Sequence, residues 1–190
     1  QLEGRIIQGL QDLNFLDVQF ELDFRLLEDY MVSGQDEVCF MISTNPGSIP
    51  PRPLGEVASG GELSRIMLAI KAVLAETDDI PTLIFDEVDA GVSGRAAQKV
   101  AYKLWTVSKG RQVLCVTHLP QIAAMADAEY TVEKRVENER TYTSVLHLDE
   151  SGRKQELARL IGGSMITETT LAGAAELLRL AEEAKSETTG

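Results

Sequence analysis

The sequence predicts an α/β fold in which a mostly parallel sheet is flanked by helices and extended by antiparallel strands. An apolar stripe with helical spacing runs over residues 63–74, and a short apolar run follows at residues 82–85. A second stripe at residues 96–105 precedes a second apolar run at residues 113–117. Strand, helix and strand in this order predict a βαβ unit with two parallel buried strands and a right-handed crossover.

The segment before this unit predicts one helix and an antiparallel pair of strands. Residues 2–13 place apolar side chains at helical spacing, and residues 18–24 alternate apolar with polar side chains. Residues 37–43 are expected to form a second strand, with the turn at residues 33–36. Prolines are frequent in residues 44–55, so we expect a loop there without ladder hydrogen bonds.

The segment after the unit predicts a hairpin and two closing helices. The hairpin is expected over residues 128–148, with its turn near residues 137–140. The helices are expected at residues 154–161 and 167–183, and the last residues, 184–190, are expected to form a flexible tail.

The bulk composition limits the partners that the chain can bind. It has 190 residues, 44% of them hydrophobic and 25% charged, and a formal net charge of -12. DNA binding draws on Lys and Arg that neutralise phosphates, so this acidic chain is a poor DNA binder through its bulk charge. No apolar run approaches the roughly 18 residues of a membrane span. Cys39 and Cys115 lack zinc-site spacing, and we expect two reduced core cysteines in a cytosolic protein.

The helix expected from residue 59 onward begins with a capping box, because Ser59 stands at the N-cap position and Glu62 follows three residues later. The plain interpretation is an ordinary helix start. The paired Gly60 and Gly61 favour a second use, since they leave the first backbone N–H groups bare at the positive end of the helix dipole. Such a helix start is suited to binding a phosphate group.

Two adjacent carboxylates, Asp86 and Glu87, follow the first apolar strand. Adjacent carboxylates repel each other unless a cation or a reacting water uses them. Ligands of open α/β sheets bind at the carboxyl ends of the strands. We therefore expect Asp86 to bind Mg2+ and Glu87 to act as general base on an attacking water. The alternative is a solvated acidic loop, since Asp89 follows.

A histidine follows the second apolar strand. The crossover should place that strand beside the first one, so His118 is expected at the same edge of the sheet as Asp86. From there, its imidazole could donate a hydrogen bond to a phosphate oxygen. The plain interpretation, a surface or structural histidine, stays open.

Taken together, these motifs resemble the second half of an ABC-type ATPase head. Residues 59–62 resemble the signature motif, residues 82–87 a Walker B strand, Asp89 the D-loop aspartate and His118 the switch histidine. The flanking residues are similar to the RecN family of bacterial SMC-like DNA repair ATPases. The strings that carry this similarity are residues 44–47, 57–65, 116–121 and 155–163.

The resemblance implies a role for each matched residue. Four signature residues would face ATP held by a second head, namely Ser59, Gly60, Gly61 and Glu62. Asp86 would serve Mg2+, Glu87 would orient the water, Asp89 would couple the two sites and His118 would sense the γ-phosphate. The implied partners are a second head in an ATP-sandwich homodimer and DNA bound through the complete protein, with no membrane.

The same resemblance implies a domain organisation. Residues 1–14 would be the stump of a coiled-coil arm, residues 15–183 the C-terminal part of the head, and residues 184–190 a tail. No G-x-x-x-x-G-K-[ST] string occurs, although this family carries that phosphate loop on an N-terminal head segment. We therefore expect a piece of a longer bacterial, cytoplasmic and nucleoid-associated ATPase of double-strand break repair, inactive without that segment.

Two other functions remain possible from the residues. One is the nucleotide-binding half of an ABC transporter, which would lack coiled-coil arms and dock on membrane helices. The other is a non-catalytic docking module that keeps a signature helix. The intact Asp86 and Glu87 pair argues against the docking module, which has no need of it.

Overall fold

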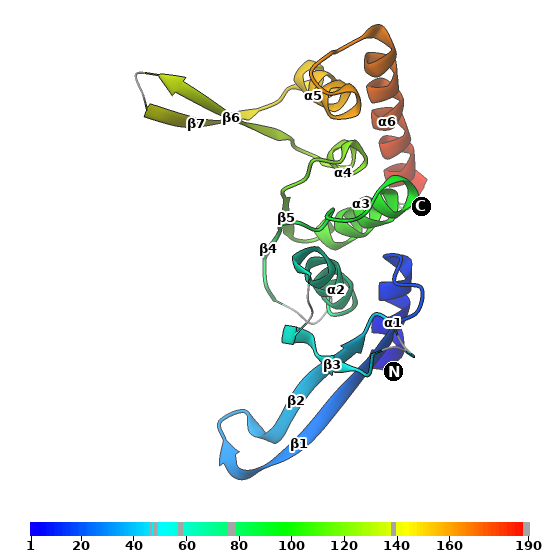
Figure 1. Cartoon of the computed structure of the whole chain (residues 1–190), viewed down its shortest axis with the longest axis vertical. Coiled ribbons are helices and arrows are strands. Elements are labelled where there is room, and N and C mark those ends of the chain that lie inside the picture. The colour runs from blue at the N-terminus through cyan, green and yellow to red at the C-terminus, as the bar shows by residue number, and fades with distance from the viewer. Residues whose placement is uncertain (46, 48, 57–58, 76–78, 138–139, 188–190) are drawn as a thin grey trace. The chain divides into compact units, whose positions relative to one another are not determined.

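The computed structural model describes the chain except residues 46, 48, 57–58, 76–78, 138–139 and 188–190 (Figure 1). The chain divides into two compact units, Gln1–Val116 and Thr117–Gly190. Within the described part of the chain, no helix combines the length and the apolar character needed to cross a membrane.

The first unit begins with a helix and a long hairpin. Helix α1 (Leu2–Asp12) is followed by strands β1 (Gln19–Met31) and β2 (Gly34–Ser43), which pair antiparallel. Met31 pairs with Gly34, so the turn consists of residues 32–33 and the predicted turn at residues 33–36 is wrong in extent. Gly34 has a φ of 111°, which glycine adopts without steric cost, and it ends the turn rather than forming its centre.

The base of the hairpin carries part of the core of this unit. Phe20 and Ile42 pair across the strands and are each 2% exposed. The Phe20 ring also lies 5.6 Å from the Phe40 ring, measured between centroids. The Glu3 carboxylate of α1 accepts a hydrogen bond of 2.8 Å from the backbone N–H of Leu22. Helix α1 is thereby attached to the sheet as well as packed against it.

The proline-containing segment forms more structure than the sequence predicts. A short strand, β3 (Arg52–Pro53), pairs antiparallel with β2 and is followed by a 3-10 turn, η1 (Leu54–Glu56). The expectation of a loop without ladder pairing is therefore wrong for these two residues. Pro53 stands opposite Met41 at the edge of the sheet, where a residue without an N–H group is tolerated.

The predicted βαβ unit is confirmed. Strand β4 (Thr82–Phe85), helix α3 (Gly94–Ser108) and strand β5 (Gln112–Cys115) follow helix α2 (Gly60–Val73). The two strands pair in parallel, from Thr82 opposite Gln112 to Phe85 opposite Cys115.

One face of this parallel pair is open, which contradicts the expectation of two fully buried strands. Leu83 and Phe85 point into the core and are 8% and 6% exposed. Ile84 on the other face is 70% exposed and Leu114 is 46% exposed. Successive side chains of a strand alternate between the two faces of the sheet. The exposed Ile84 and Leu114 therefore lie on one apolar face, which no described segment of the unit covers.

Helices α1, α2 and α3 pack together and form the main core of the first unit. Gly9 of α1 is buried against α2, where a Cβ atom would make an ordinary van der Waals contact of 3.6 Å with the Cβ of Ala69. The Lys103 ammonium of α3 lies 3.1 Å from the Asp12 carboxylate at the end of α1. The fully or nearly fully buried aliphatic residues of these helices include Ile6, Leu10, Ile66, Ile70, Val100 and Leu104.

The second unit contains the predicted hairpin and helices. Strands β6 (Tyr130–Glu137) and β7 (Arg140–His147) pair antiparallel, and part of their expected turn lies outside the described residues. Helix α5 (Glu150–Gly162) begins four residues earlier than predicted, because Asp149 caps it by accepting a 2.7 Å hydrogen bond from the Gly152 N–H.

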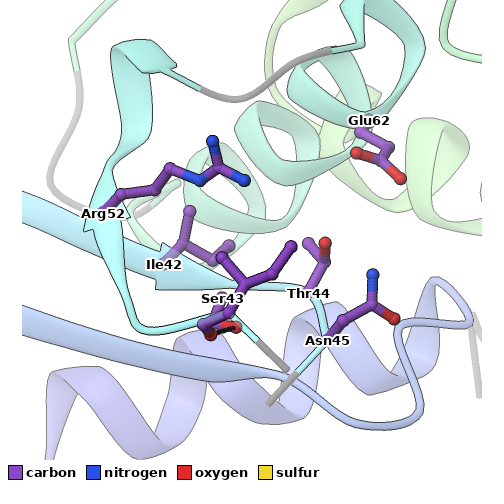
Figure 2. Close-up of a pocket in the computed structure, with 7 residues that line it drawn as sticks. Ile42, Ser43, Thr44, Asn45, Arg52 and Glu62 are labelled. Atoms are coloured by element: carbon purple, nitrogen blue, oxygen red, sulfur yellow. Dashed lines mark hydrogen bonds between the residues drawn. The ribbon is translucent and has the colours of Figure 1, made fainter. Parts of the chain in front are cut away.

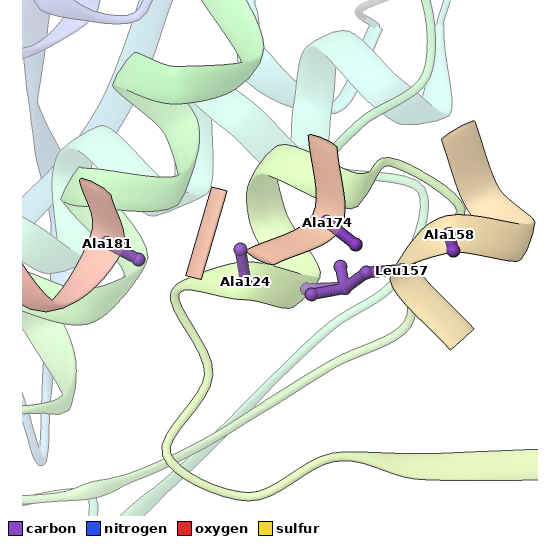
Figure 3. Close-up of a cluster of buried hydrophobic side chains, with 6 residues drawn as sticks. Ala124, Leu157, Ala158, Ala174 and Ala181 are labelled. Atoms are coloured by element: carbon purple, nitrogen blue, oxygen red, sulfur yellow. The ribbon is translucent and has the colours of Figure 1, made fainter. Parts of the chain in front are cut away.

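The remaining helices of this unit pack on α5 through small side chains. Helix α4 (Pro120–Ala124) and helix α6 (Glu168–Glu187) contact α5 around Leu157, which is fully buried (Figure 3). Ala124, Ala158, Ala174 and Ala181 belong to the same buried cluster, and their small side chains allow the helix backbones to approach closely. The predicted tail is helical as far as Glu187, and residues 188–190 lie outside the described part.

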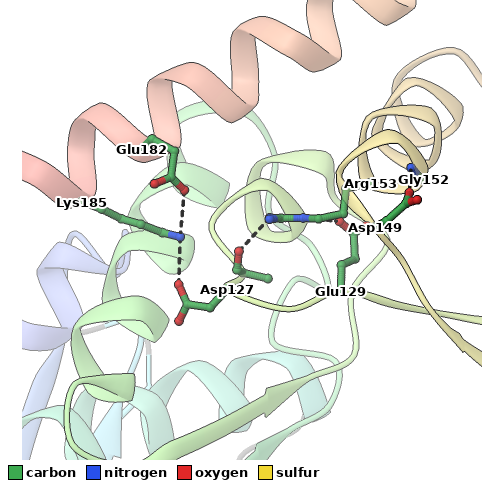
Figure 4. Close-up of polar contacts among 8 residues, drawn as sticks. Asp127, Glu129, Asp149, Gly152, Arg153, Glu182 and Lys185 are labelled. Atoms are coloured by element: carbon green, nitrogen blue, oxygen red, sulfur yellow. Dashed lines mark hydrogen bonds and ion pairs between the residues drawn. The ribbon is translucent and has the colours of Figure 1, made fainter.

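A buried ion pair joins the hairpin to α5 in the same unit. Arg153 lies 3.4 Å from the Glu129 carboxylate and donates a 2.7 Å hydrogen bond to the carbonyl of Ala126 (Figure 4). The two side chains are only 18% and 9% exposed. Burial raises the pKa of Glu129, the Arg153 cation opposes this, and the nearby Glu156 adds to it.

Replacing Arg153 is expected to destabilise the protein in a pH-dependent way. Arg153→Met leaves the Glu129 carboxylate buried without its cation, which we expect to lower the free energy of unfolding by about 2 kcal/mol at pH 7. The folded-state pKa of Glu129 then lies further above its unfolded value. The part of the loss due to Glu129 therefore shrinks as pH falls toward the ordinary carboxyl pKa, while the part due to the lost bond to the Ala126 carbonyl stays. Urea unfolding at pH 7 and pH 5 measures both values.

The matched control for this variant is Arg159→Met. Arg159 lies 2.6 Å from Glu156 on the surface of the same helix, where its side chain is 54% exposed. Such exposed pairs contribute little, so we expect a loss of less than about 1 kcal/mol. An equal loss at both pH values for Arg153→Met would contradict the role given to Glu129.

Candidate functional site

The start of helix α2 is capped as the sequence predicts. Ser59 adopts an extended conformation with a φ of -123°, and its hydroxyl accepts a hydrogen bond of 3.4 Å from the Glu62 N–H. Gly60 and Gly61 form the first turn, where the backbone N–H groups have no partner within a helix. The side chain of Glu62 does not complete the capping box within the described residues, and it lines a pocket instead.

This pocket lies beside the first turn of α2 (Figure 2). Arg52 of β3 and Glu62 of α2 lie on opposite sides of it, and Thr44 and Asn45 follow the end of β2 between them. Its volume of about 190 Å³ is smaller than the roughly 300 Å³ at which pockets begin to enclose a whole small-molecule ligand. The pocket therefore suits a single polar group rather than a complete nucleotide.

The two predicted carboxylates stand at the carboxyl end of β4 in a tight turn. The Asp86 carboxylate accepts a 2.9 Å hydrogen bond from the backbone N–H of Glu87. The carbonyl of Glu87 accepts a 3.0 Å bond from the Ala90 N–H. Glu87 has a φ of 57°, in the left-handed region that costs a residue with a Cβ atom about 1–2 kcal/mol. Such strain is common at functional sites.

Two side chains of α2 bind the backbone of this turn. The Ser64 hydroxyl donates a 2.7 Å hydrogen bond to the carbonyl of Asp86, and the Arg65 guanidinium donates a 2.5 Å bond to the carbonyl of Ala90. Arg65 is 8% exposed and lies 5.5 Å from the centre of the Phe15 ring. Burial lowers the pKa of Arg65, and the nearby Glu62 opposes this. Helix α2 and the acidic turn are thus joined within one chain.

The paired glycines allow this close contact. A Cβ atom on Gly61 would lie 2.6 Å from the Cβ of Ala90 and 3.1 Å from the carbonyl oxygens of Ala90 and Glu87. A Cβ atom on Gly60 would lie 2.5 Å from Oε2 of Glu87. The Cβ on Gly61 would meet backbone oxygens and a short side chain, so Gly61 is needed for packing in its own chain, whereas the Cβ on Gly60 would meet only the end of the flexible Glu87 side chain. Reasoning from the sequence assigned the pair to phosphate contact alone and missed this.

The environment of the turn is negative. Asp89 is buried, with 4% exposure, and Asp86 and Glu87 are exposed. The pKa of the Cys115 thiol in β5 is raised to about 12 by burial, and by the charges of Asp89 and Asp86. This thiol stays protonated at neutral pH. Cys39 and Cys115 are both free, but they are half-buried, so the expectation that both lie in the core is wrong.

The fit of this environment to Mg2+ is partial. Among the described residues, no group of three or more His, Cys, Asp and Glu side chains is arranged to hold a metal ion. Asp86 offers an exposed carboxylate at the strand end. Mg2+ takes six oxygens and often binds proteins through one or two carboxylates, with water and phosphate oxygens supplying the rest. The residues present therefore fit one protein ligand of such an ion.

The predicted histidine belongs to the second unit. His118 is exposed and lies in the segment that leads to α4. The neighbouring Thr117 hydroxyl accepts a 3.0 Å hydrogen bond from the Leu119 N–H, which fixes the local turn. The predicted position of His118 beside Asp86 stays a prediction.

Comparison with known proteins identifies the relatives of this chain. No protein-family model matches it. The DNA repair protein RecN of Vibrio cholerae is 46% identical over 181 residues, which cover 94% of this chain and 32% of that protein. The RecN protein of Bacillus subtilis is 50% identical over 153 residues, which cover 80% of this chain and 26% of that protein. By sequence, the chain is RecN-like. It spans about a third or less of the curated relatives it matches.

Solved structures place the fold of this RecN-like chain among SMC heads. The Smc head domain with a coiled coil and joint from Pyrococcus yayanosii matches with a TM-score of 0.59 and 20% identity, over 82% of this chain and 28% of that chain. The head with an extended coiled coil from Pyrococcus furiosus, bound to the C-terminal domain of ScpA, matches with a TM-score of 0.54 and 20% identity, over 83% and 37%. The fold is an α/β lobe of an ABC-type head. Relatives that are DNA repair proteins favour this interpretation over a transporter half.

Replacing Arg65 is expected to separate α2 from the acidic turn. Arg65→Met removes the bond to the Ala90 carbonyl and the charge above the Phe15 ring, and it leaves that carbonyl without its donor. We expect the free energy of unfolding to fall by about 2 kcal/mol. Urea unfolding measures this value. Arg95→Met, at an exposed position on α3, is the control and should change it by less than about 0.5 kcal/mol. Equal losses would contradict the structural role of Arg65.

Proposed function

We propose that this chain is the C-terminal part of the head of an SMC-like ATPase in recombinational repair of DNA double-strand breaks. One observation carries the proposal, namely the direct contact between the signature helix α2 and the acidic turn after β4. The relatives named DNA repair protein RecN support the biological role. The proposed cellular place is the bacterial cytoplasm at the nucleoid.

The proposed reaction is the attack of water on the γ-phosphorus of ATP, with ADP as the leaving group. Glu87 orients the water and accepts its proton on the carboxylate. Asp86 would hold Mg2+, which would neutralise charge on the phosphates. Asp89 couples the two sites and His118 donates a hydrogen bond to the γ-phosphate. These four roles follow from the motif resemblance and the positions in the chain.

The signature residues are proposed to act on ATP held by a second head. The bare N–H groups of Gly60 and Gly61 and the Ser59 hydroxyl would face the γ-phosphate at the positive end of the α2 dipole. Glu62 lines the adjacent pocket and would take part in the same contact. The SMC ATPases of one matching structure undergo ATP-driven dimerization and DNA-stimulated activation. We propose the same ATP-sandwich homodimer for the complete protein, with DNA bound outside this acidic chain.

The open face of the parallel sheet is proposed to receive the N-terminal head segment. Ile84, Leu114 and Val116 are 70%, 46% and 64% exposed, so a continuous apolar surface lies next to the site. Burying it stabilises a complex by roughly 25 cal/mol for each Å². The segment with the phosphate loop would cover this face and supply the Lys that grips ATP. Helix α1 is proposed as the base of the coiled-coil arm.

The chain by itself is expected to hydrolyse no ATP. Without the phosphate loop, the carboxylates of β4 have no bound nucleotide to act on. Co-expression with the N-terminal head segment should restore phosphate release above that of either part, measured as inorganic phosphate over time. Substitution of the phosphate-loop Lys in that segment is the control. Turnover by the chain alone, at the rate of the assembled head, would overturn the proposal.

Glu87→Gln in the complete protein is expected to abolish turnover while ATP still binds. Glutamine keeps the shape of the side chain but cannot accept the proton of the attacking water, so kcat should fall by about 100-fold or more. Phosphate release measures turnover, and equilibrium binding of a fluorescent ATP analogue measures affinity. A turnover equal to the wild type would remove Glu87 from the base role.

A further inference from the structure

We infer that Gly60 positions the Glu87 carboxylate of its own chain, in addition to any contact that it makes with phosphate in a partner head. The inference rests on the proposed ATPase function. It concerns a different site from the phosphate contact, because the Glu87 of a head acts on the ATP bound by that same head.

The space next to Gly60 is occupied by the carboxylate. A Cβ atom at this position would lie 2.5 Å from Oε2 and 3.7 Å from Cδ of Glu87, and no other described atom outside its immediate neighbours would lie within 4 Å. Any residue other than glycine must therefore displace the Glu87 side chain. Because glycine has only a hydrogen atom in place of Cβ, the Glu87 carboxylate can lie against the first turn of α2.

The backbone of Glu87 cannot move to accommodate such a change. Its N–H is bound to the Asp86 carboxylate and its carbonyl to the Ala90 N–H. The neighbouring carbonyls of Asp86 and Ala90 accept the bonds from Ser64 and Arg65. Because the turn is held at these points, the movement falls on the flexible end of the Glu87 side chain, which carries the proposed base.

The adjacent Gly61 has a different role. A Cβ atom there would meet the Cβ of Ala90 at 2.6 Å and two backbone oxygens at 3.1 Å, none of which is the end of a flexible side chain. Gly61→Ala must therefore shift the backbone and destabilise the fold. Gly60→Ala keeps the fold and moves a carboxylate. The two glycines of the signature are thus distinguishable by experiment.

Mixed dimers of the complete protein test the role of Gly60 in its own chain. Two copies with different affinity tags are co-expressed and purified through both tags, and Glu87→Gln in one copy silences one of the two ATP sites. In the first dimer, Gly60→Ala is placed on the other copy. The remaining active site then has alanine at position 60 beside its own Glu87, and the unchanged signature residues of the first copy face its ATP. In the second dimer, both substitutions are on one copy. The remaining active site then keeps Gly60 beside its own Glu87, and the substituted signature residues of the other copy face its ATP.

The reference is the dimer with Glu87→Gln alone in one copy. In the first dimer we expect kcat to fall by at least about 10-fold with an unchanged KM for ATP, because displacement of the base affects the chemical step. In the second dimer we expect KM for ATP to rise. A first dimer with the kcat of the reference would overturn the inference, as would the same change of kcat and KM in both dimers, which indicates a general structural defect.

A second variant pair keeps the test decisive if Gly60→Ala lowers stability. Glu87→Asp shortens the side chain and withdraws the carboxylate from the space that the new methyl group needs. The loss of kcat caused by Gly60→Ala should therefore be several-fold smaller in the Glu87→Asp background than with Glu87 intact. Equal losses in both backgrounds would overturn the inference. Wild-type turnover of the Glu87→Gln homodimer would instead remove Glu87 from the base role, whereas a complete protein that hydrolyses no ATP would refute the proposed function itself.

Discussion

The contact between the first turns of α2 and the turn after β4 is the constraint on which the rest of the first unit depends. Ser64 and Arg65 donate to two carbonyls of the turn, and Gly61 lets the two backbones meet. A strand end with two exposed carboxylates is repulsive and mobile unless its backbone is fixed. The structure fixes it through the neighbouring helix, and Asp86 and Glu87 stay exposed to solvent.

The periodic elements of the fold were predictable because each depends on local patterns. Apolar spacing predicted α2, α3 and the parallel pair, and the cap at Ser59 formed as expected. The exposure of Ile84 was not predictable in this way. An apolar strand with no charges indicates burial on both faces, and the pattern does not say whether the covering segment is part of the same chain. The strand at Pro53 was missed because its pairing depends on the edge that β2 offers.

The candidate site was predictable in composition but not in its internal contacts. The motifs identified Asp86, Glu87 and the signature residues, whose roles remain proposals. The positive φ of Glu87 has no signal in the sequence, since glutamate seldom takes it and only the tertiary contacts impose it. Arg65 was visible as part of a RecN-like string, but its bond to Ala90 joins positions 25 residues apart. Such contacts follow from packing and not from spacing.

The absence of a side chain at Gly60 has a consequence for how substitutions in signature motifs are interpreted. In the proposed symmetric dimer, a substitution at Gly60 would affect two active sites, the partner's through the phosphate contact and its own through Glu87. A rate measured on the symmetric variant would then combine two defects, lost phosphate binding and a misplaced base. Under this proposal, the missing Cβ atom would couple two reactions that take place in different copies of the protein.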